Sequence, residues 1–347
     1  MLDRLHALRA VSGKAALGLV LGSTLLLSAC GSGSAGGPST TTNAALTACT
    51  ATVSDLSTGA GGTATATKVA GISGKIAIDG SSALAPLFQA AGQEFDVANG
   101  TQTTVTPNGS GNGLKDVEGG AVQIGLSDVY ALQKEPTPGA YHDLVDHQVA
   151  VVAFTLVTNN DLKGKVNNLT VDQIKQIYTG QISNWSQLGG PNEQISVVNR
   201  PTASGTRATF KVYVLGGTSE SAGTTLTQDT TGAVATAVGN TPGAIGYVAT
   251  GFVTGQYSTL VAPICIGGYA ASAKNIGAGN YQFWGIEHAY TKGPASGAAK
   301  ALLQYAVSSS VQQSDLPRLS YLQASSLSAS ALASHTPTGA PAPESLS

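Results

Sequence analysis

Apolar, β-branched runs alternate along the chain with segments in which apolar residues recur every three or four positions. The runs predict strands at residues 75–78, 103–106, 123–126, 148–158, 195–199, 244–248 and 260–266. The helical spacing predicts helices at 83–97, from 114 onward, at 170–178 and from 204 onward. Strands that alternate with helices in this way predict an α/β fold whose sheets are covered on both faces.

The first 30 residues are typical of an export signal. Three basic residues fall within the first 14 positions, and an apolar run at 15–27 follows that is too short to span a bilayer. The run ends in Leu27-Ser28-Ala29-Cys30, which resembles a bacterial lipoprotein cleavage box. We therefore expect a signal peptide at 1–29, lipidation of Cys30, and an extracytoplasmic protein held at the membrane by its lipid. An ordinary secretory signal with an unrelated cysteine is the alternative.

Two segments lack the alternating pattern. Residues 30–73 are rich in Gly, Ser and Thr, which predicts a flexible linker. Residues 325–347 are rich in Ser, Ala and Pro, which predicts a disordered tail. The 347 residues of the chain suggest that the folded part between these segments forms two lobes.

The chain has three cysteines, an odd number for an exported protein. Lipidation of Cys30 would leave Cys49 and Cys265, which could form a disulfide in an oxidising compartment. Two separate, small apolar side chains are the alternative for this pair.

Composition limits the kind of ligand. Hydrophobic residues make up 42% of the chain and charged residues only 10%, with a net charge of −2. No basic field is present that could hold a nucleic acid or an anionic membrane surface. A bound anion must therefore be held locally, by hydrogen bonds and one or two cations.

Three predicted strand-to-helix turns combine glycine with hydroxyl residues. They are Gly80-Ser81-Ser82, Gly109-Ser110-Gly111 and Ser204-Gly205-Thr206. The first turn of a helix has free N–H donors and a partial positive charge, so it favours an anion. One such turn is ordinary helix capping, but three of them beside Arg200, whose guanidinium suits an oxyanion, indicate an anion site.

These turns also carry a family resemblance. In order along the chain, residues 80–86 (GSSALAP), 109–113 (GSGNG), 125–128 (GLSD) and 200–207 (RPTASGTR) resemble the phosphate-binding proteins of ABC transporters. Residues 174–180 (IKQIYTG), Asn184-Trp185 and residues 243–247 (GAIGY) resemble the same family. The resemblance covers about residues 74–320. This chain departs from the family at Thr202, where relatives often have an acidic residue.

The resemblance implies a two-lobed, type II periplasmic-binding-protein fold that holds inorganic phosphate in the cleft between the lobes. Lobe 1 would comprise 74–155 and 250–324, and lobe 2 would comprise 156–249. The implied ligand-binding residues are Ser81, Ser82, Ser110, Gly111, Asp128, Arg200, Ser204, Gly205 and Thr206. Asp128 would accept the proton of hydrogen phosphate and so reject sulfate, which carries none.

The resemblance implies that the protein captures phosphate and delivers it to an ABC import permease. We expect it to act as a monomer without a cofactor or metal. Binding of another oxyanion, such as sulfate or molybdate, is one alternative, and a phosphate-sensing module without transport is another. An enzyme is not expected, because the sequence has no Gly-x-Ser-x-Gly elbow, no P-loop lysine and no cluster of metal ligands.

Overall fold

A computed structural model describes Cys49, Leu56 and residues 62–222 and 225–346. The predicted signal peptide, Cys30 and most of the predicted linker lie outside these residues.

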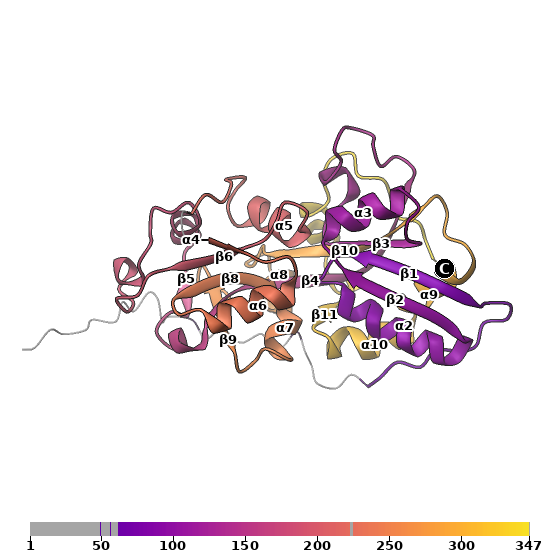
Figure 1. Ribbon diagram of the computed structural model, residues 1–347, viewed down its shortest axis with the longest axis horizontal. Helices are drawn as coiled ribbons and strands as arrows, with labels where there is room; N and C mark the ends of the chain where they lie inside the picture. Colours follow the sequence, from indigo (N-terminus) through magenta and orange to yellow (C-terminus); the bar gives the residue numbers. More distant parts are fainter. Residues whose placement is uncertain (1–48, 50–55, 57–61, 223–224, 347) are drawn as a thin grey trace, which may run out of the picture. The chain divides into compact units, whose positions relative to one another are not determined.

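The strands form a sheet in the order β2-β1-β3-β10-β4-β8-β6-β7, with β5, β9 and β11 off this path (Figure 1). The bounds are β1 Gly74–Gly80, β2 Thr101–Pro107, β3 Ile124–Ser127, β4 Leu144–Asn159, β5 Asn168–Leu169, β6 Ser196–Asn199, β7 Thr225–Thr227, β8 Ala244–Ala249, β9 Val261–Ile266, β10 Trp284–Lys292 and β11 Tyr321–Leu322.

Strand β4 connects two halves of this sheet. Its residues 144–153 pair with β10, which continues to β3, β1 and β2, and we call these strands the first half. Its residues 154–159 pair with β8 and β9, and β8 continues to β6 and β7, which form the second half. The predicted apolar run at 148–158 lies within this strand, which is longer at both ends than the sequence predicts.

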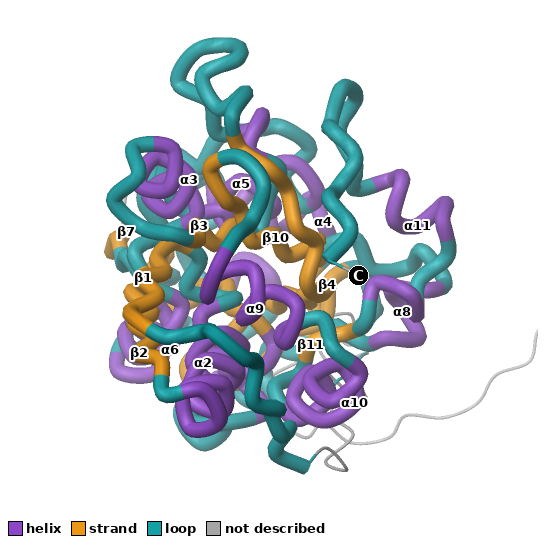
Figure 2. The backbone as a smooth tube through the Cα atoms, turned by 90° about the vertical axis from the view of Figure 1, so that its right-hand side faces the viewer, coloured by secondary structure: helices purple, strands orange, loops and turns teal. Residues whose placement is uncertain are grey.

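Helices cover the two halves. Their bounds are α2 Ala85–Asn99, α3 Ser110–Glu118, α4 Val171–Tyr178, α5 Gly205–Tyr213, α6 Thr231–Asn240, α7 Thr250–Thr254, α8 Ala273–Gly277, α9 Gly297–Ala306, α10 Ser309–Arg318 and α11 Ala329–Ser334. Figure 2 shows α2, α9 and α10 together beside the strands of the first half. No helix in the part of the chain that the structure describes has both the length and the apolarity to span a bilayer.

Local sequence explains where α2 begins and ends. A proline lies in its first turn, where a missing N–H costs nothing. The helix ends at Gly100, whose φ of 71° is the left-handed conformation that glycine adopts most easily. Between these ends Leu87, Phe88 and Phe95 are fully buried, so this face anchors the helix on the first half.

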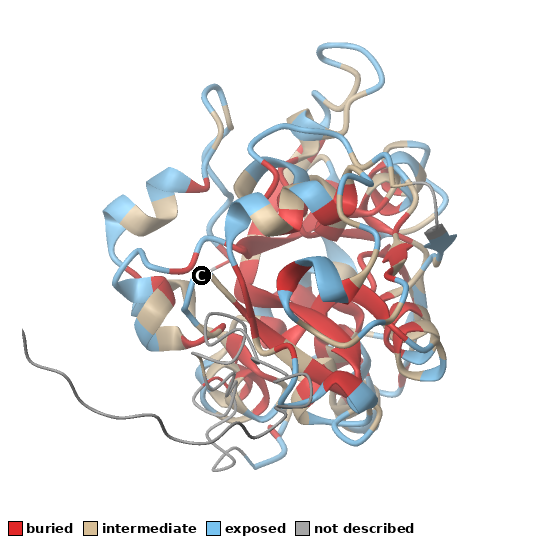
Figure 3. Cartoon of the chain, turned by 90° about the vertical axis from the view of Figure 1, so that its left-hand side faces the viewer, coloured by how far each residue is buried: buried red, intermediate tan, exposed pale blue. Residues whose placement is uncertain are grey.

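The core follows the strands, as the buried residues in Figure 3 show. In the second half it is aromatic: Phe210 of α5 packs on Tyr178 of α4 and on Tyr247 of β8, with ring centroids 4.7 and 4.4 Å apart. Trp185 is also buried there and donates a 3.0 Å hydrogen bond from Nε1 to the carbonyl of Gly243. This packing fixes the start of α5, which carries one of the three turns.

The chain returns to the first half later than the sequence predicts. Residues 250–324 were expected in lobe 1, but β9 pairs with residues 156–159 of β4 and with β5, so it belongs to the second half. The next strand of the first half is β10. The lobe boundary expected near residue 250 differs from the observed strand pairing, because the sequence does not show which edge of β4 a later strand will join.

The C-terminal segment also differs from the prediction of a disordered tail. It forms α11, and the ring of His335 lies between Trp284 and Tyr213, with centroid separations of 3.5 and 3.9 Å. Farther along, the N–H of Glu344 donates to the carbonyl of Asp146 over 2.8 Å. A few anchoring side chains therefore suffice to dock a segment whose average composition resembles that of a disordered chain.

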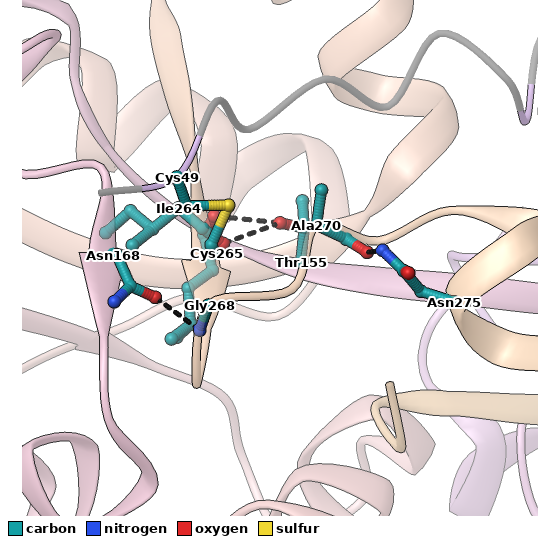
Figure 4. The surroundings of a disulfide bond; sticks show 9 residues. Cys49, Thr155, Asn168, Ile264, Cys265, Gly268, Ala270 and Asn275 are labelled. Carbon is teal, nitrogen blue, oxygen red and sulfur yellow. Dashed lines mark hydrogen bonds between the residues drawn. A yellow bond between two sulfur atoms is a disulfide. The ribbon is translucent and has the colours of Figure 1, made fainter. Parts of the chain in front are cut away.

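The structure contains a disulfide between Cys49 and Cys265, whose Cα atoms are 6.3 Å apart (Figure 4). Cys265 is fully buried in β9. The bond therefore ties the segment before the folded part to a strand 216 residues later in the chain.

Candidate anion-binding site

The first turn follows β1 and is packed without free space. Gly80 has a φ of 123°, and a Cβ at this position would lie 2.2 Å from the carbonyl oxygen of Leu126. Glycine is therefore required where β1 passes β3. Directly after it, Ser81 Oγ accepts hydrogen bonds of 3.0 Å from the N–H groups of Ala83 and Leu84. These bonds fix the turn that leads into α2.

The second turn begins α3. Gly109 has a φ of 99°, and Ser110 is fully buried. Ser110 Oγ accepts a 3.1 Å hydrogen bond from the N–H of Asp128, which connects this turn to the end of β3. The N–H of Gly111 donates to the carbonyl of Ala203 over 2.8 Å, so α3 reaches the loop that precedes α5.

The third turn begins α5 in the second half. Ser204 caps this helix by accepting a 3.2 Å hydrogen bond from the N–H of Arg207. A Cβ at Gly205 would lie 2.3 Å from Ser110 Oγ, so glycine allows the second and third turns to touch. The helix starts of α3 and α5 consequently meet.

Asp128 lies directly after β3 and is 3% exposed. Its carboxylate accepts a hydrogen bond from Ser81 Oγ and another, of 2.7 Å, from Thr206 Oγ1. It therefore joins the first turn to the third, across the two halves of the sheet. A carboxylate has about four lone-pair positions, so these two bonds leave it able to accept a further hydrogen.

Arg200 follows β6 and is 1% exposed. One Nη donates to Ser82 Oγ over 3.2 Å and to the carbonyl of Asp229 over 2.7 Å, while the other lies 3.4 Å from Thr231 Oγ1. Its Nε has no hydrogen-bonding partner among the described residues. Burial lowers the pKa of this guanidinium from its ordinary value, although arginine remains charged in proteins.

No carboxylate among the described residues forms an ion pair with Arg200, whereas Arg207 pairs with Glu220 at 3.3 Å. Arg207 also donates to the backbone carbonyl of Arg200. It therefore holds the loop of Arg200 in place, which agrees with its interpretation from sequence as a structural charge. The positive charge of Arg200 remains available for a ligand.

All nine residues proposed from the sequence lie in this cluster. It combines elements of both halves: Ser81, Ser82, Ser110, Gly111 and Asp128 from the first, and Arg200, Ser204, Gly205 and Thr206 from the second. Cys49 and Cys265 form the disulfide on β9 instead, and Cys30 lies outside the described residues.

Sequence reasoning missed Thr231, the first residue of α6. Ser82 Oγ accepts a 3.0 Å hydrogen bond from the N–H of Thr231, and the two hydroxyl oxygens are also 3.0 Å apart. A signal was present, because Thr230-Thr231-Gly232 repeats the hydroxyl–glycine pattern of the other turns. This turn is not among the predicted ones, because the apolar spacing after it predicts no helix.

The site as a whole suits a small anion with several oxygens. Three helix starts, those of α3, α5 and α6, contribute N–H and hydroxyl donors, and Arg200 adds a planar cation. The carboxylate of Asp128 would repel an oxygen without a proton and accept a hydrogen from one that carries it. Within the described residues, no three His, Cys, Asp or Glu side chains are placed to hold a metal ion.

Comparison with known proteins agrees with this description. A model of the PBP superfamily domain matches residues 58–310, so the chain belongs to the PBP superfamily. The phosphate-binding protein PstS of Bacillus subtilis (strain 168) is 43% identical over 251 residues, which is 72% of this chain and 81% of that protein. At this identity and coverage the chain belongs to the family of phosphate-binding proteins PstS.

Solved structures show the same fold. A putative phosphate ABC transporter substrate-binding protein with bound phosphate, from Clostridium perfringens, has a TM-score of 0.64 and 25% identity and covers 72% of this chain and 99% of its own. An ABC-type phosphate transport receptor from Vibrio cholerae has a TM-score of 0.55, 25% identity and the same coverage. The two-lobed α/β fold expected from the sequence is therefore confirmed.

Proposed function

We propose that this protein captures inorganic phosphate outside the cytoplasm and delivers it to an ABC import permease. One observation carries the proposal: Arg200, which forms no ion pair with a carboxylate of the described residues, and Asp128 are both buried where three helix starts meet. The names of the relatives at 43% and 25% identity support phosphate as the ligand.

The nine residues of the cluster are proposed as the ligand-binding set, with Thr231 added. In this assignment Arg200 and the helix starts bind the charged oxygens, and Asp128 accepts the proton of hydrogen phosphate. We propose that lobe 1 comprises residues 74–153 and 284–322 and that lobe 2 comprises residues 154–266, which the strand pairing supports.

Titration calorimetry of the purified mature protein against phosphate, arsenate, sulfate and molybdate tests the ligand. Phosphate should bind, and sulfate should compete poorly even in large excess. Equal binding of sulfate and phosphate would instead favour a general oxyanion receptor. Phosphate uptake by cells that lack the protein separates transport from sensing. Uptake should fall if the protein delivers phosphate to the permease, and the capacity for uptake should persist if the protein only senses phosphate.

The relatives are binding proteins, and we propose that this chain acts as a receptor and not as a catalyst. Release of product from a chromogenic phosphate ester by the pure protein would contradict this. We also propose a lipid anchor at Cys30 and a monomeric state. Cys30→Ala should block processing or release the protein from membranes, and gel filtration should give the mass of one chain.

A further inference from the structure

Three successive carbonyl groups in the loop before α5 accept hydrogen bonds from the first half of the sheet. Lys134 Nζ donates to the carbonyls of Thr202 and Ser204 over 2.7 and 2.9 Å. The carbonyl of Ala203, between them, accepts the 2.8 Å bond from the N–H of Gly111. Lys134 directly follows the 3-10 turn η1 (Ala131–Gln133), which comes after β3, whereas the loop 202–204 follows β6. These bonds therefore run between the two halves.

The contact is also close in space. A Cβ at Gly111 would lie 3.3 Å from Cα of Ala203, and one at Gly109 would lie 3.4 Å from its carbonyl oxygen. The loop that Lys134 holds leads without interruption into Ser204, Gly205 and Thr206 at the start of α5. If the hydrogen bonds of this loop were lost, the third turn of the site would no longer be held against the second.

The charge of Lys134 belongs to the electrostatics of the site. Burial lowers its pKa to about 8, the carboxylate of Asp128 favours its charged form, and Arg207 and Arg200 disfavour it. A bound anion beside Arg200 and Asp128 would favour the charged ammonium, so anion binding and protonation of Lys134 support each other.

We propose that Lys134 is a positioning residue for anion binding: its ammonium ties the carbonyls of Thr202 and Ser204 to the first half and so holds the α5 turn over the ligand. This rests on the proposed phosphate-binding function and adds a residue that the ligand itself need not touch. Because the bonds join the two halves, they must break when the halves separate, and their main effect is on the rate of ligand release.

Lys134→Met tests this, because methionine keeps a long apolar stem and removes both the charge and the donors. The matched control is Lys165→Met, at an exposed lysine. At pH 7 the Lys134→Met protein should bind phosphate at least tenfold more weakly, mainly through faster release in stopped-flow measurements. Lys165→Met should match the wild type, and thermal unfolding should show that both variants fold.

A pH series from 6 to 10 provides a readout that a merely structural role would not change. The ionisation of phosphate affects all proteins equally, so the ratio of the Kd of Lys134→Met to that of the wild type reports Lys134 alone. This ratio should stay constant at low pH and fall toward one as the pH rises through about 8.

The outcomes separate the two proposals. A wild type that does not bind phosphate would overturn the proposed function. A wild type that binds phosphate, with equal affinity in Lys134→Met or a Kd ratio that does not change with pH, would overturn the role of Lys134 and leave the function standing.

Discussion

Thr206 Oγ1 donates a 2.7 Å hydrogen bond to Oδ2 of Asp128, and the two residues belong to opposite halves of the sheet. Ser81 donates to the other carboxylate oxygen from the first half. Asp128 is thus held between the turns that are proposed to surround the anion. A carboxylate in this position joins the halves, and in the proposed site it would select for a ligand that carries a proton.

Asp128→Asn should narrow the preference for phosphate over sulfate. The amide removes the repulsion of an unprotonated oxygen and adds a donor, so sulfate binding should rise relative to phosphate by roughly tenfold, or about 1.4 kcal/mol. Competition assays at one pH and ionic strength measure this ratio, with the exposed Asp172→Asn as control. A lower melting temperature with an unchanged ratio would mean that Asp128 is only structural.

Arg200→Ala should weaken phosphate binding by about 2–5 kcal/mol, the usual cost of removing one partner of a buried charge pair. Arg200→Lys should also bind more weakly, because an ammonium cannot reproduce the planar fork that reaches Ser82 and the carbonyl of Asp229. Calorimetry of both variants checks this. Affinities equal to that of the wild type in both would remove Arg200 from the site.

Glu287 of β10 should make the protein less stable as the pH rises. It is fully buried, and burial together with the neighbouring Asp128 carboxylate raises its pKa well above the ordinary value. The folded protein keeps this proton at a pH where the unfolded chain has lost it. The stabilisation is therefore complete below the ordinary glutamate pKa and falls with increasing pH, by up to about 1.4 kcal/mol per pH unit.

Glu287→Gln needs no proton to remain neutral and should lose this pH dependence. Urea unfolding at pH 5 and pH 8 should show a smaller decrease in the free energy of unfolding for Glu287→Gln than for the wild type. The partly exposed Glu193→Gln is the control. Parallel decreases in all three proteins would show that Glu287 is not the group responsible.

Reduction of the Cys49–Cys265 disulfide should lower the free energy of unfolding by about 2–4 kcal/mol, because the bond closes a loop between residues 216 positions apart. Urea unfolding with and without a reductant measures this. The Cys265→Ser variant cannot form the disulfide, so the reductant should not change its free energy of unfolding. Phosphate affinity should persist in the reduced protein, since the disulfide lies on β9 and not at the three turns. Identical unfolding midpoints in both conditions would argue against a stabilising bond.

The turns of the site could be predicted because their signals are local. A hydroxyl residue at a helix start, or a glycine where the backbone must turn at positive φ, depends on residues only a few positions apart. Gly80, Ser110 and Ser204 could therefore be proposed from the sequence, and the structure places them in one cluster. Asp128 could be proposed as a ligand-binding residue only through the family resemblance, because a single aspartate is recognised there by its position in the ordered set of motifs.

The remaining features depend on which distant segments become neighbours. Lys134 lies in an unremarkable polar stretch, and its importance arises only because the loop 202–204 of the other half presents carbonyls to it. Glu287 looks like any charge within a strand until β10 is placed between β3 and β4, where no water reaches it.

The sequence by itself determined the α/β alternation and the positions of the turns, and it predicts an export signal, because each is a property of neighbouring residues. Only the tertiary structure decided the half to which β9 belongs, the docking of the C-terminal segment through His335, and the bonds from Lys134. The physical reason is that strand pairing, burial and charge coupling join groups tens to hundreds of positions apart, and their free energy depends on the final packing and not on local conformation.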